Sequence, residues 1–230
     1  MAPDEPSFVC ARSLLLTDKP VHGSDGGCVA VSPSGRVVCV VGEPDEDAIR
    51  AALAETAPWF ELVAAPRDAA SYGKILNAPG EPATLYVGGV EQPDAPPPAN
   101  DVSVELLSTQ DDYRLAHVPA GLRIDIMDAL SRTPVAAAVV EDLPVSFCYP
   151  AGLTETYWDV AVETLDGYKR RGLATGTYER MAARMRMRGL RPVWGAPEGN
   201  EASREMAKKL RFEAAGALHV WALDRETLSV

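Results

Sequence analysis

The chain has 230 residues, of which 47% are apolar and 24% charged, so a packed globular fold is expected and wholesale disorder is excluded. No apolar run approaches the ~20 residues that a membrane helix needs. The acidic opening, with Asp4 and Glu5, does not resemble a secretory signal, so we expect a cytoplasmic protein with no membrane partner. A net charge of −11 argues against general nucleic-acid binding, because a polyanion requires a basic surface.

The N-terminal part alternates short apolar runs with helical patterns. Apolar composition and turn residues predict strands at 27–31, 36–41, 59–64 and 83–87. A helix is predicted over 44–57, because Pro44 can open it and the acids that follow suit its N-terminus. No constellation of catalytic residue types occurs here. The pattern therefore predicts a small α/β unit.

A proline-rich segment separates this unit from the rest of the chain. Four prolines fall within residues 91–101, and they cannot continue a helix or an inner strand. We therefore predict an N-terminal α/β domain over 1–101 that ends in this linker, and a second domain over 102–230.

The second part predicts a mixed sheet with helices, an α/β (α+β) arrangement. Strands are expected at 102–107, 133–140, 145–149, 157–165, 192–196 and 212–223, with a turn at 141–144. Helical patterns cover 111–131, 172–188 and 201–210. Asn200 is placed to cap the last helix, and Gly216 to mark a bulge in the last strand.

The cysteines and histidines do not form a metal-binding pattern. The four cysteines include no C-x-x-C pair and the three histidines are scattered, so no metal is expected. Cys39 and Cys148 lie within apolar strand-like runs, which favours buried, reduced thiols.

The segment most informative about function lies between two predicted elements. The strand before it ends near Leu165, and the helix after it begins near Gly172. A helix N-terminus presents free N–H groups and a positive dipole end, and Gly172 lets a ligand approach the backbone. Residues 166–211 hold 12 basic and 5 acidic side chains, a local excess of +7. This favours a site for a small anion such as a diphosphate. The alternative is an ordinary strand–turn–helix joint with a solvated basic turn.

The segment Lys169-Arg-Arg-Gly-Leu-Ala174 resembles the diphosphate-binding signature of the GNAT acyltransferase superfamily, Gln/Arg-x-x-Gly-x-Gly/Ala. Residues 191–203 and 206–212 resemble the second half of that family's core, and the resemblance covers about 102–224. It implies a GNAT-like acyl-CoA N-acyltransferase fold in the C-terminal half. It also suggests a subgroup with an extra N-terminal half, which we expect to be a degenerate copy of the same fold.

The resemblance implies acetyl-CoA or another acyl-CoA as donor, and an amine on a small molecule or a protein as acceptor. It places the donor against the backbone of residues 161–164 and at the basic turn. The residues expected to bind it are Val162, Glu163, Thr164, Lys169, Arg170, Arg171, Gly172, Leu173, Ala174, Thr175, Asn200 and Ser203.

The sequence departs from the family pattern at three positions. Lys169 replaces the usual Gln or Arg, and Arg211 replaces the Gly that usually precedes Phe212. Ala207 stands where many relatives have a Tyr that protonates the leaving thiolate. Other hydroxyls are candidates for that role: Tyr149, Tyr157 and Tyr178, of which Tyr178 falls on the apolar helix face and is expected in the core.

Three carboxylates are candidates for the general base. Asp159 and Glu163 share one face of the predicted strand at 157–165, and Glu155 precedes it. Each can alternatively be a solvated surface charge.

These observations predict an N-acetyltransferase that acts on a primary amine. The missing Tyr at position 207 keeps open a non-catalytic acyl-CoA-binding or regulatory protein. Nucleic-acid binding is disfavoured, because the arginine-rich run lacks interleaved aromatic residues: Arg180, Arg184, Arg186, Arg188 and Arg191. The acidic remainder of the chain favours a cationic acceptor such as a primary amine or polyamine.

Overall fold

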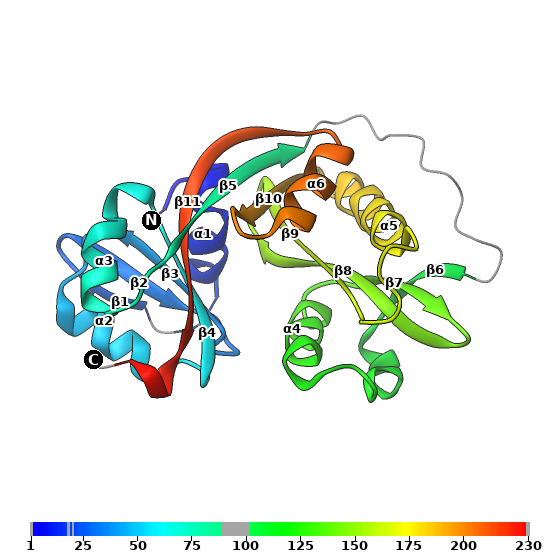
Figure 1. Ribbon diagram of the computed structural model, residues 1–230, viewed down its shortest axis with the longest axis horizontal. Helices are drawn as coiled ribbons and strands as arrows, with labels where there is room; N and C mark the ends of the chain where they lie inside the picture. Colours follow the sequence, from blue (N-terminus) through cyan, green and yellow to red (C-terminus); the bar gives the residue numbers. More distant parts are fainter. Residues whose placement is uncertain (1, 18, 20, 89–101, 229–230) are drawn as a thin grey trace.

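The computed structural model describes residues 2–17, 19, 21–88 and 102–228, and its strands form one continuous mixed sheet (Figure 1). The strands are β1 (Val21–Ser24), β2 (Gly27–Val31), β3 (Val37–Gly42), β4 (Trp59–Ala64), β5 (Glu81–Gly88), β6 (Val102–Leu107), β7 (Val135–Val140), β8 (Leu143–Leu153), β9 (Tyr157–Thr164), β10 (Arg191–Pro197) and β11 (Phe212–Asp224). Their order across the sheet is β1-β2-β3-β4-β11-β5-β10-β9-β8-β7-β6.

Helices cover both parts of this sheet. The α-helices are α1 (Val9–Leu15), α2 (Glu46–Ala54), α3 (Ala69–Ile75), α4 (Ala120–Leu130), α5 (Leu173–Met187) and α6 (Glu201–Lys209). Short 3-10 helices are η1 (Pro6–Phe8), η2 (Pro66–Asp68), η3 (Thr109–Leu115) and η4 (Arg225–Thr227). No helix in the described ranges combines the length and apolar character that a membrane span requires.

The two halves repeat one order of elements. In the N-terminal half, α1 is followed by β1, β2, β3, α2, β4, α3 and β5; in the C-terminal half, α4 is followed by β7, β8, β9, α5, β10, α6 and β11. Each half has one parallel pair, β3 with β4 and β9 with β10, and the other pairings are antiparallel. The N-terminal α/β unit therefore has the architecture of the C-terminal one, except that its described residues form no counterpart of β6.

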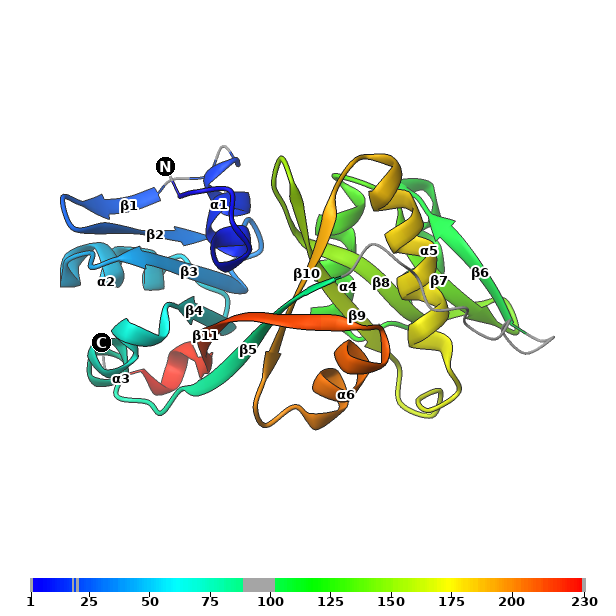
Figure 2. The ribbon, with the colours of Figure 1, turned by 90° about the horizontal axis from the view of Figure 1, so that it is seen from above.

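The last strand of each half is exchanged with the other half. β5 pairs with β10, where Tyr86 lies opposite Trp194, and β11 pairs with β4, where Trp221 lies opposite Leu62. β5 and β11 also pair with each other, and they cross between the halves in Figure 2. Each half is thus completed by a strand from the other. The proline-rich linker at 91–101 lies outside the described residues, and the domain boundary placed there stays a prediction.

Most of the predicted elements are present, and their ends have identifiable physical causes. The Asn200 Oδ1 accepts a hydrogen bond from the Ser203 N–H at 3.0 Å, which caps α6 as expected. The pairing of β11 shifts register between Ala214 and Gly216, the site of the predicted bulge.

Several features differ from the prediction. The structure adds α1, β1 and α3, which are short and carry weak periodic patterns. The turn predicted at 141–144 is wrong at its end, because Leu143 and Pro144 already pair with β7.

The prediction of a reduced Cys39 is also wrong, whereas Cys148 is free and buried as expected. Cys39 forms a disulfide with Cys10. Cys10 lies on the unpredicted helix α1, which packs against β3 and brings the two side chains together.

Each half has its own hydrophobic core. In the N-terminal half Ile49, Phe60, Leu62 and Trp221 are almost completely buried together, so β11 delivers a C-terminal tryptophan to the N-terminal core. The C-terminal core is rich in aromatic rings that pack at centroid distances typical of favourable pairs: Trp158, Tyr178, Trp194 and Phe212. Tyr178 is therefore a core residue, as its place on the helix predicts.

Candidate functional site

The parallel strands β9 and β10 separate after a short region of contact. They pair only where Tyr157, Trp158 and Asp159 meet Arg191–Val193. Beyond that point β9 continues beside β8, and β10 continues beside β5. The edge of β9 from Val160 onwards is therefore open toward β10.

The open edge of β9 presents unpaired peptide groups. The Leu165 N–H donates to the Val145 carbonyl at 2.8 Å, and hydrogen-bonded pairs alternate along an antiparallel ladder. Ala161 and Glu163 therefore bond to β8, whereas the peptide groups of Val162 and Thr164 face away from it. Val162 and Thr164 belong to the strand segment that is expected to hold the acyl donor. Their free N–H and C=O groups lie at the opening.

The turn that leads into α5 has an uncapped helix N-terminus. Gly172 is the N-cap residue with φ +79°, makes no side-chain cap, and has no atom within 4 Å of the position a Cβ would occupy. Within the described residues, no backbone hydrogen bond uses the N–H groups of Gly172, Leu173 or Ala174. Arg170 also adopts a left-handed conformation, with φ +62°. Consecutive exposed N–H groups in such a turn form a concave anion-binding nest.

Basic side chains surround this nest. The Lys169 Nζ lies 2.8 Å from the Asp166 carboxylate, and both side chains are exposed. The Arg171 guanidinium lies 5.7 Å from the centre of the Tyr168 ring. The positive charge therefore stands at the rim, while the backbone supplies the centre of the nest.

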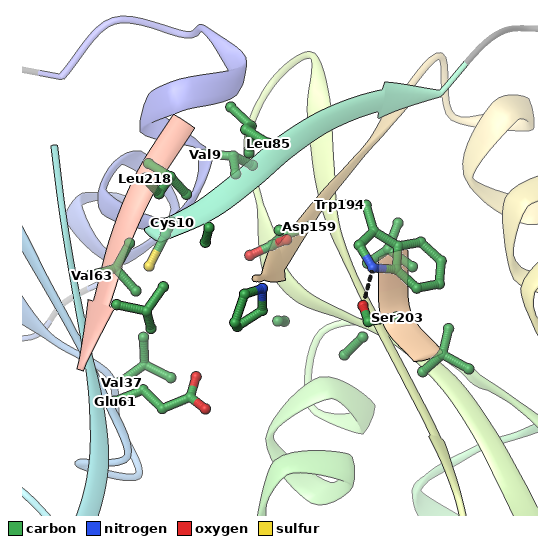
Figure 3. Close-up of a pocket in the computed structure, with 18 of the residues that line it drawn as sticks. Val9, Cys10, Val37, Glu61, Val63, Leu85, Asp159, Trp194, Ser203 and Leu218 are labelled. Carbon is green, nitrogen blue, oxygen red and sulfur yellow. Dashed lines mark hydrogen bonds between the residues drawn. The ribbon is translucent and has the colours of Figure 1, made fainter. Parts of the chain in front are cut away.

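A large cavity of ≈ 2130 Å³ connects the open edge of β9, the nest and the N-terminus of α6. Figure 3 shows the part of this cavity around Asp159 and Ser203. The cavity is lined by all the residues predicted to bind a donor except Arg171. Residues of the N-terminal half complete its wall, among them Val37, Glu61 and Val63. In the described ranges, no group of three or more His, Cys, Asp or Glu side chains could hold a metal ion.

The beginning of α6 carries a hydroxyl group into the cavity. The Trp194 indole N–H donates to the Ser203 Oγ at 2.8 Å, and both residues line the cavity (Figure 3). Because this Oγ accepts a hydrogen bond from Trp194, its own proton can be donated to a ligand.

Position 207 cannot supply a comparable group. Ala207 is completely buried among the aromatic residues of the C-terminal core. Of the three tyrosines named as alternatives, Tyr149 lines the cavity, whereas Tyr157 and Tyr178 are not part of its lining. Burial raises the pKa of Tyr149 well above its ordinary value.

The candidate bases have different surroundings. Asp159 points into the cavity, and dehydration by the surrounding protein, followed by the charge of Glu61, raises its pKa to about 7. Glu163 also lines the cavity, and dehydration raises its pKa. Glu155 is separated from both, because it lies outside the lining and pairs with Arg12 through contacts of 2.6 and 2.7 Å. We therefore do not retain Glu155 as a base.

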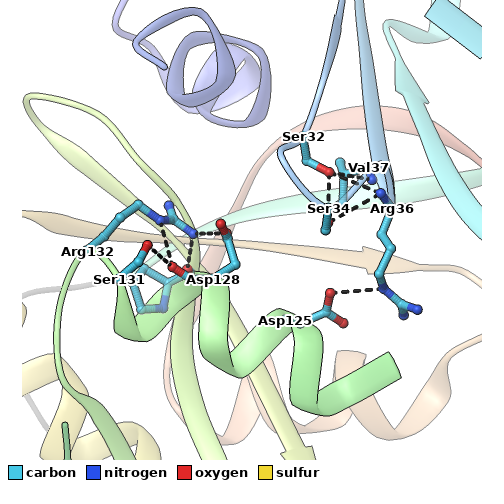
Figure 4. Close-up of polar contacts among 9 residues, drawn as sticks. Ser32, Ser34, Arg36, Val37, Asp125, Asp128, Ser131 and Arg132 are labelled. Atoms are coloured by element: carbon cyan, nitrogen blue, oxygen red, sulfur yellow. Dashed lines mark hydrogen bonds and ion pairs between the residues drawn. The ribbon is translucent and has the colours of Figure 1, made fainter. Parts of the chain in front are cut away.

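Sequence reasoning missed an acidic group on the other side of the cavity. Arg36 in the N-terminal half pairs with Asp125 of α4 at 3.0 Å, which joins the two halves (Figure 4). Glu61 on β4 is an exposed residue that lines the cavity. Partial dehydration by the surrounding protein nevertheless raises its pKa, and dehydration also raises the pKa of Asp125. The only sequence signal was a lone acid between apolar neighbours in a strand.

Comparison with known proteins confirms the resemblance. Residues 136–221 match the family model described as GNAT acetyltransferase. A comparison with curated proteins found no match.

Solved structures share the fold over most of the chain. A GCN5-related N-acetyltransferase-like protein from Streptococcus suis has 16% identity, a TM-score of 0.74, and coverage of 96% of this chain and 94% of its own. A GCN5-related N-acetyltransferase from Kribbella flavida has 11% identity, a TM-score of 0.61 and 96% coverage of both chains. A tandem GNAT protein from the clavulanic acid biosynthesis pathway has 10% identity, a TM-score of 0.53, and coverage of 86% and 78%. At these identities the likeness establishes the fold.

Proposed function

We propose that this protein, whose residues 136–221 match the GNAT acetyltransferase family model and whose fold is the GNAT fold, transfers an acetyl group from acetyl-CoA to a primary amine. One observation carries the proposal: an uncapped nest of backbone N–H groups, an open strand edge and the carboxylate of Asp159 all face one cavity. An acetyltransferase needs these three parts, for the donor's phosphates, for its extended arm and for the acceptor's proton.

The residues that line the cavity are suited to bind acetyl-CoA. The N–H groups of Gly172, Leu173 and Ala174 would hold the diphosphate, and the open space at Gly172 leaves room for it. The peptide groups of Val162 and Thr164 would hydrogen-bond the amide groups of the pantetheine arm. When bound, acetyl-CoA supplies a thioester, which is an activated acetyl group.

Asp159 is the base that we assign. An alkylamine is protonated at neutral pH and must lose a proton before its nitrogen can attack a carbonyl carbon. A carboxylate with a pKa of about 7 is largely ionised just above neutrality and retains enough basicity to accept that proton. The free main-chain N–H groups of β9 would stabilise the negative charge that develops on the carbonyl oxygen.

Ser203 is the hydroxyl that we assign to the leaving sulfur. Trp194 fixes the Oγ by donating to it, so the serine proton is directed elsewhere, and Ser203 lines the cavity. A hydrogen bond to the departing thiolate would stabilise it, and solvent can then deliver the proton. This role compensates for the buried Ala207.

The second candidate function is a non-catalytic acyl-CoA-binding protein, which the absence of a tyrosine at position 207 favours. Calorimetry with coenzyme A and thiol release in the presence of a panel of amines separate the two. Coenzyme A binding with thiol release on an amine supports the enzyme. Binding without turnover on any amine supports the alternative, and the absence of binding contradicts both.

A further inference from the structure

The N-terminal half closes the cavity on the side where an acceptor would enter. Val37 on β3 and Glu61 and Val63 on β4 form this wall, opposite Asp159 of β9 (Figure 3). Residues of both halves therefore surround whatever binds next to Asp159. The nest for the donor, by contrast, is built from the C-terminal half alone.

Two carboxylates point into the cavity from opposite walls without a cationic partner. Figure 3 shows Glu61 and Asp159 directed into the same space from β4 and β9. Neither carboxylate forms an ion pair with a side chain in the described ranges. Arg36 also lines the cavity and its charge acts on Glu61, but its guanidinium is paired with Asp125. The charge of Glu61 also reaches Asp159, since it contributes to the raised pKa of that group. Two carboxylates without an ion-pair partner in one cavity favour a ligand that brings positive charge.

The surfaces between these carboxylates are apolar. Val9, Val37, Val63, Leu85 and Leu218 line the same part of the cavity and are drawn around it in Figure 3. Such walls favour a hydrocarbon chain, which they can remove from water. This observation is independent of the charges and points to the body of the ligand rather than its ends.

We propose that the acceptor is an aliphatic diamine or polyamine, with the amine to be acetylated at Asp159, its alkyl chain on the apolar wall and a second ammonium at Glu61 of the N-terminal half. The proposal rests on the proposed acetyltransferase function and specifies its substrate class. Glu61 is then a specificity-determining residue. A monoamine leaves this carboxylate unpaired, so it binds more weakly.

The test compares two amines with the same five-carbon chain, cadaverine with two ammonium groups and n-pentylamine with one. Acetylation kinetics are measured on the full chain, its Glu61→Gln variant, and the control Glu213→Gln, which removes an equal charge from β11 outside the cavity. We expect kcat/KM to favour cadaverine about 5- to 30-fold, through KM, a range limited by the exposure of Glu61. Glu61→Gln should abolish this preference, and Glu213→Gln should retain it.

Coenzyme A affinity, measured by calorimetry, should be the same in all three proteins and shows that the variants are folded. Equal kcat/KM values for the two amines, or a preference that survives in Glu61→Gln, overturn the proposal while the acetyltransferase function stands. If coenzyme A binds but neither these two amines nor any amine of the panel is acetylated, the proposed function fails. Calorimetric titration of the coenzyme A complex with both amines then decides the inference: Glu61-dependent binding of cadaverine supports it, and its absence overturns it.

Discussion

The two halves share one architecture but treat the same strand-to-helix joint in opposite ways. In the C-terminal half the joint before α5 ends at an uncapped Gly172 with open space in front of it. In the N-terminal half the Asp45 carboxylate accepts from the Ala48 N–H at 2.8 Å, and the neighbouring Glu46 and Asp47 add negative charge. A carboxylate of the chain thus occupies the position where an anion would bind.

The strand pairs differ in the same sense. Beyond their paired parts both β9 and β3 line the cavity, at Val162 and at Val40, but on the β3 side a disulfide between Cys10 of α1 and Cys39 ties the helix to the strand. The comparison teaches that only one copy retains the features of a donor site. The other copy forms a wall of the cavity, and under our proposal its Glu61 contributes to acceptor recognition.

The largest effect should be on coenzyme A binding. It is expected when a carboxylate is placed at the C-terminal joint, as one is present at the N-terminal joint. Gly172→Asp should weaken coenzyme A binding roughly 100-fold or more, because it places a carboxylate and a strained backbone where the diphosphate binds. The measurement is calorimetric titration with coenzyme A.

Gly167→Asp is the matched control. Gly167 has φ +88° and equally open space, but it does not line the cavity. Its variant carries the same charge and comparable strain and should bind coenzyme A within a few-fold of the parent. An unchanged affinity in Gly172→Asp would falsify the assignment of the nest.

Removal of the base should have the next largest effect. Asp159→Asn should lower kcat about 100-fold or more, with little change in the KM for acetyl-CoA. In the parent, kcat/KM should rise with pH through about 7, because the protonated carboxyl below that pH cannot accept a proton. Glu155→Gln, which alters a carboxylate paired with Arg12, should leave the rate unchanged. A pH profile without this rise, or an equal loss in both variants, contradicts the assignment.

Loss of the Ser203 hydroxyl should lower kcat less than loss of the Asp159 carboxylate does. Ser203→Ala should lower kcat about 3- to 10-fold, the worth of one hydrogen bond to the leaving thiolate, and Ser203→Thr should restore part of it. The rates are compared at saturating acetyl-CoA, with coenzyme A affinity as the control for folding. Equal rates for parent and alanine variant would remove Ser203 from the reaction.

The ionised form of Asp159 should also lower the free energy of unfolding. Its pKa is about 7 in the native state and 3.8 is its ordinary value, so between these values the native state binds more protons and stability falls as pH rises. Asp159→Asn should therefore raise the free energy of unfolding by roughly 1–3 kcal/mol at about pH 8 and by little at about pH 4. Urea denaturation at both pH values measures this, and a gain that is equal at both contradicts the raised pKa.

The smallest expected effect is on stability. It concerns two residues in corresponding turns, one between α3 and β5 and the other between α6 and β11. Asn77, after α3, and Arg211, after α6, both adopt positive φ, of 46° and 60°. Asparagine tolerates this conformation better than arginine does. Arg211→Gly should raise the free energy of unfolding by about 0.5–1 kcal/mol without changing coenzyme A affinity. A loss of stability would show that the arginine side chain contributes more than its backbone costs.

The sequence predicts local features of this molecule and leaves its long-range ones open. Alternation and turn residues locate β2, β4 and β9, and the Gly172 joint follows from a glycine beside basic residues at a helix start. The exchange of β5 and β11 could not be predicted, because alternation identifies a strand and not its neighbour. Glu61 was missed for the same reason: its proximity to Asp159 arises only when the halves pack together.

A crystal structure of the protein with acetyl-CoA tests the central claim most directly. The account predicts the diphosphate on the N–H groups of Gly172, Leu173 and Ala174, with the acetyl group beside Asp159. Electron density for the diphosphate at the N-terminus of α2, or elsewhere in the molecule, would contradict it.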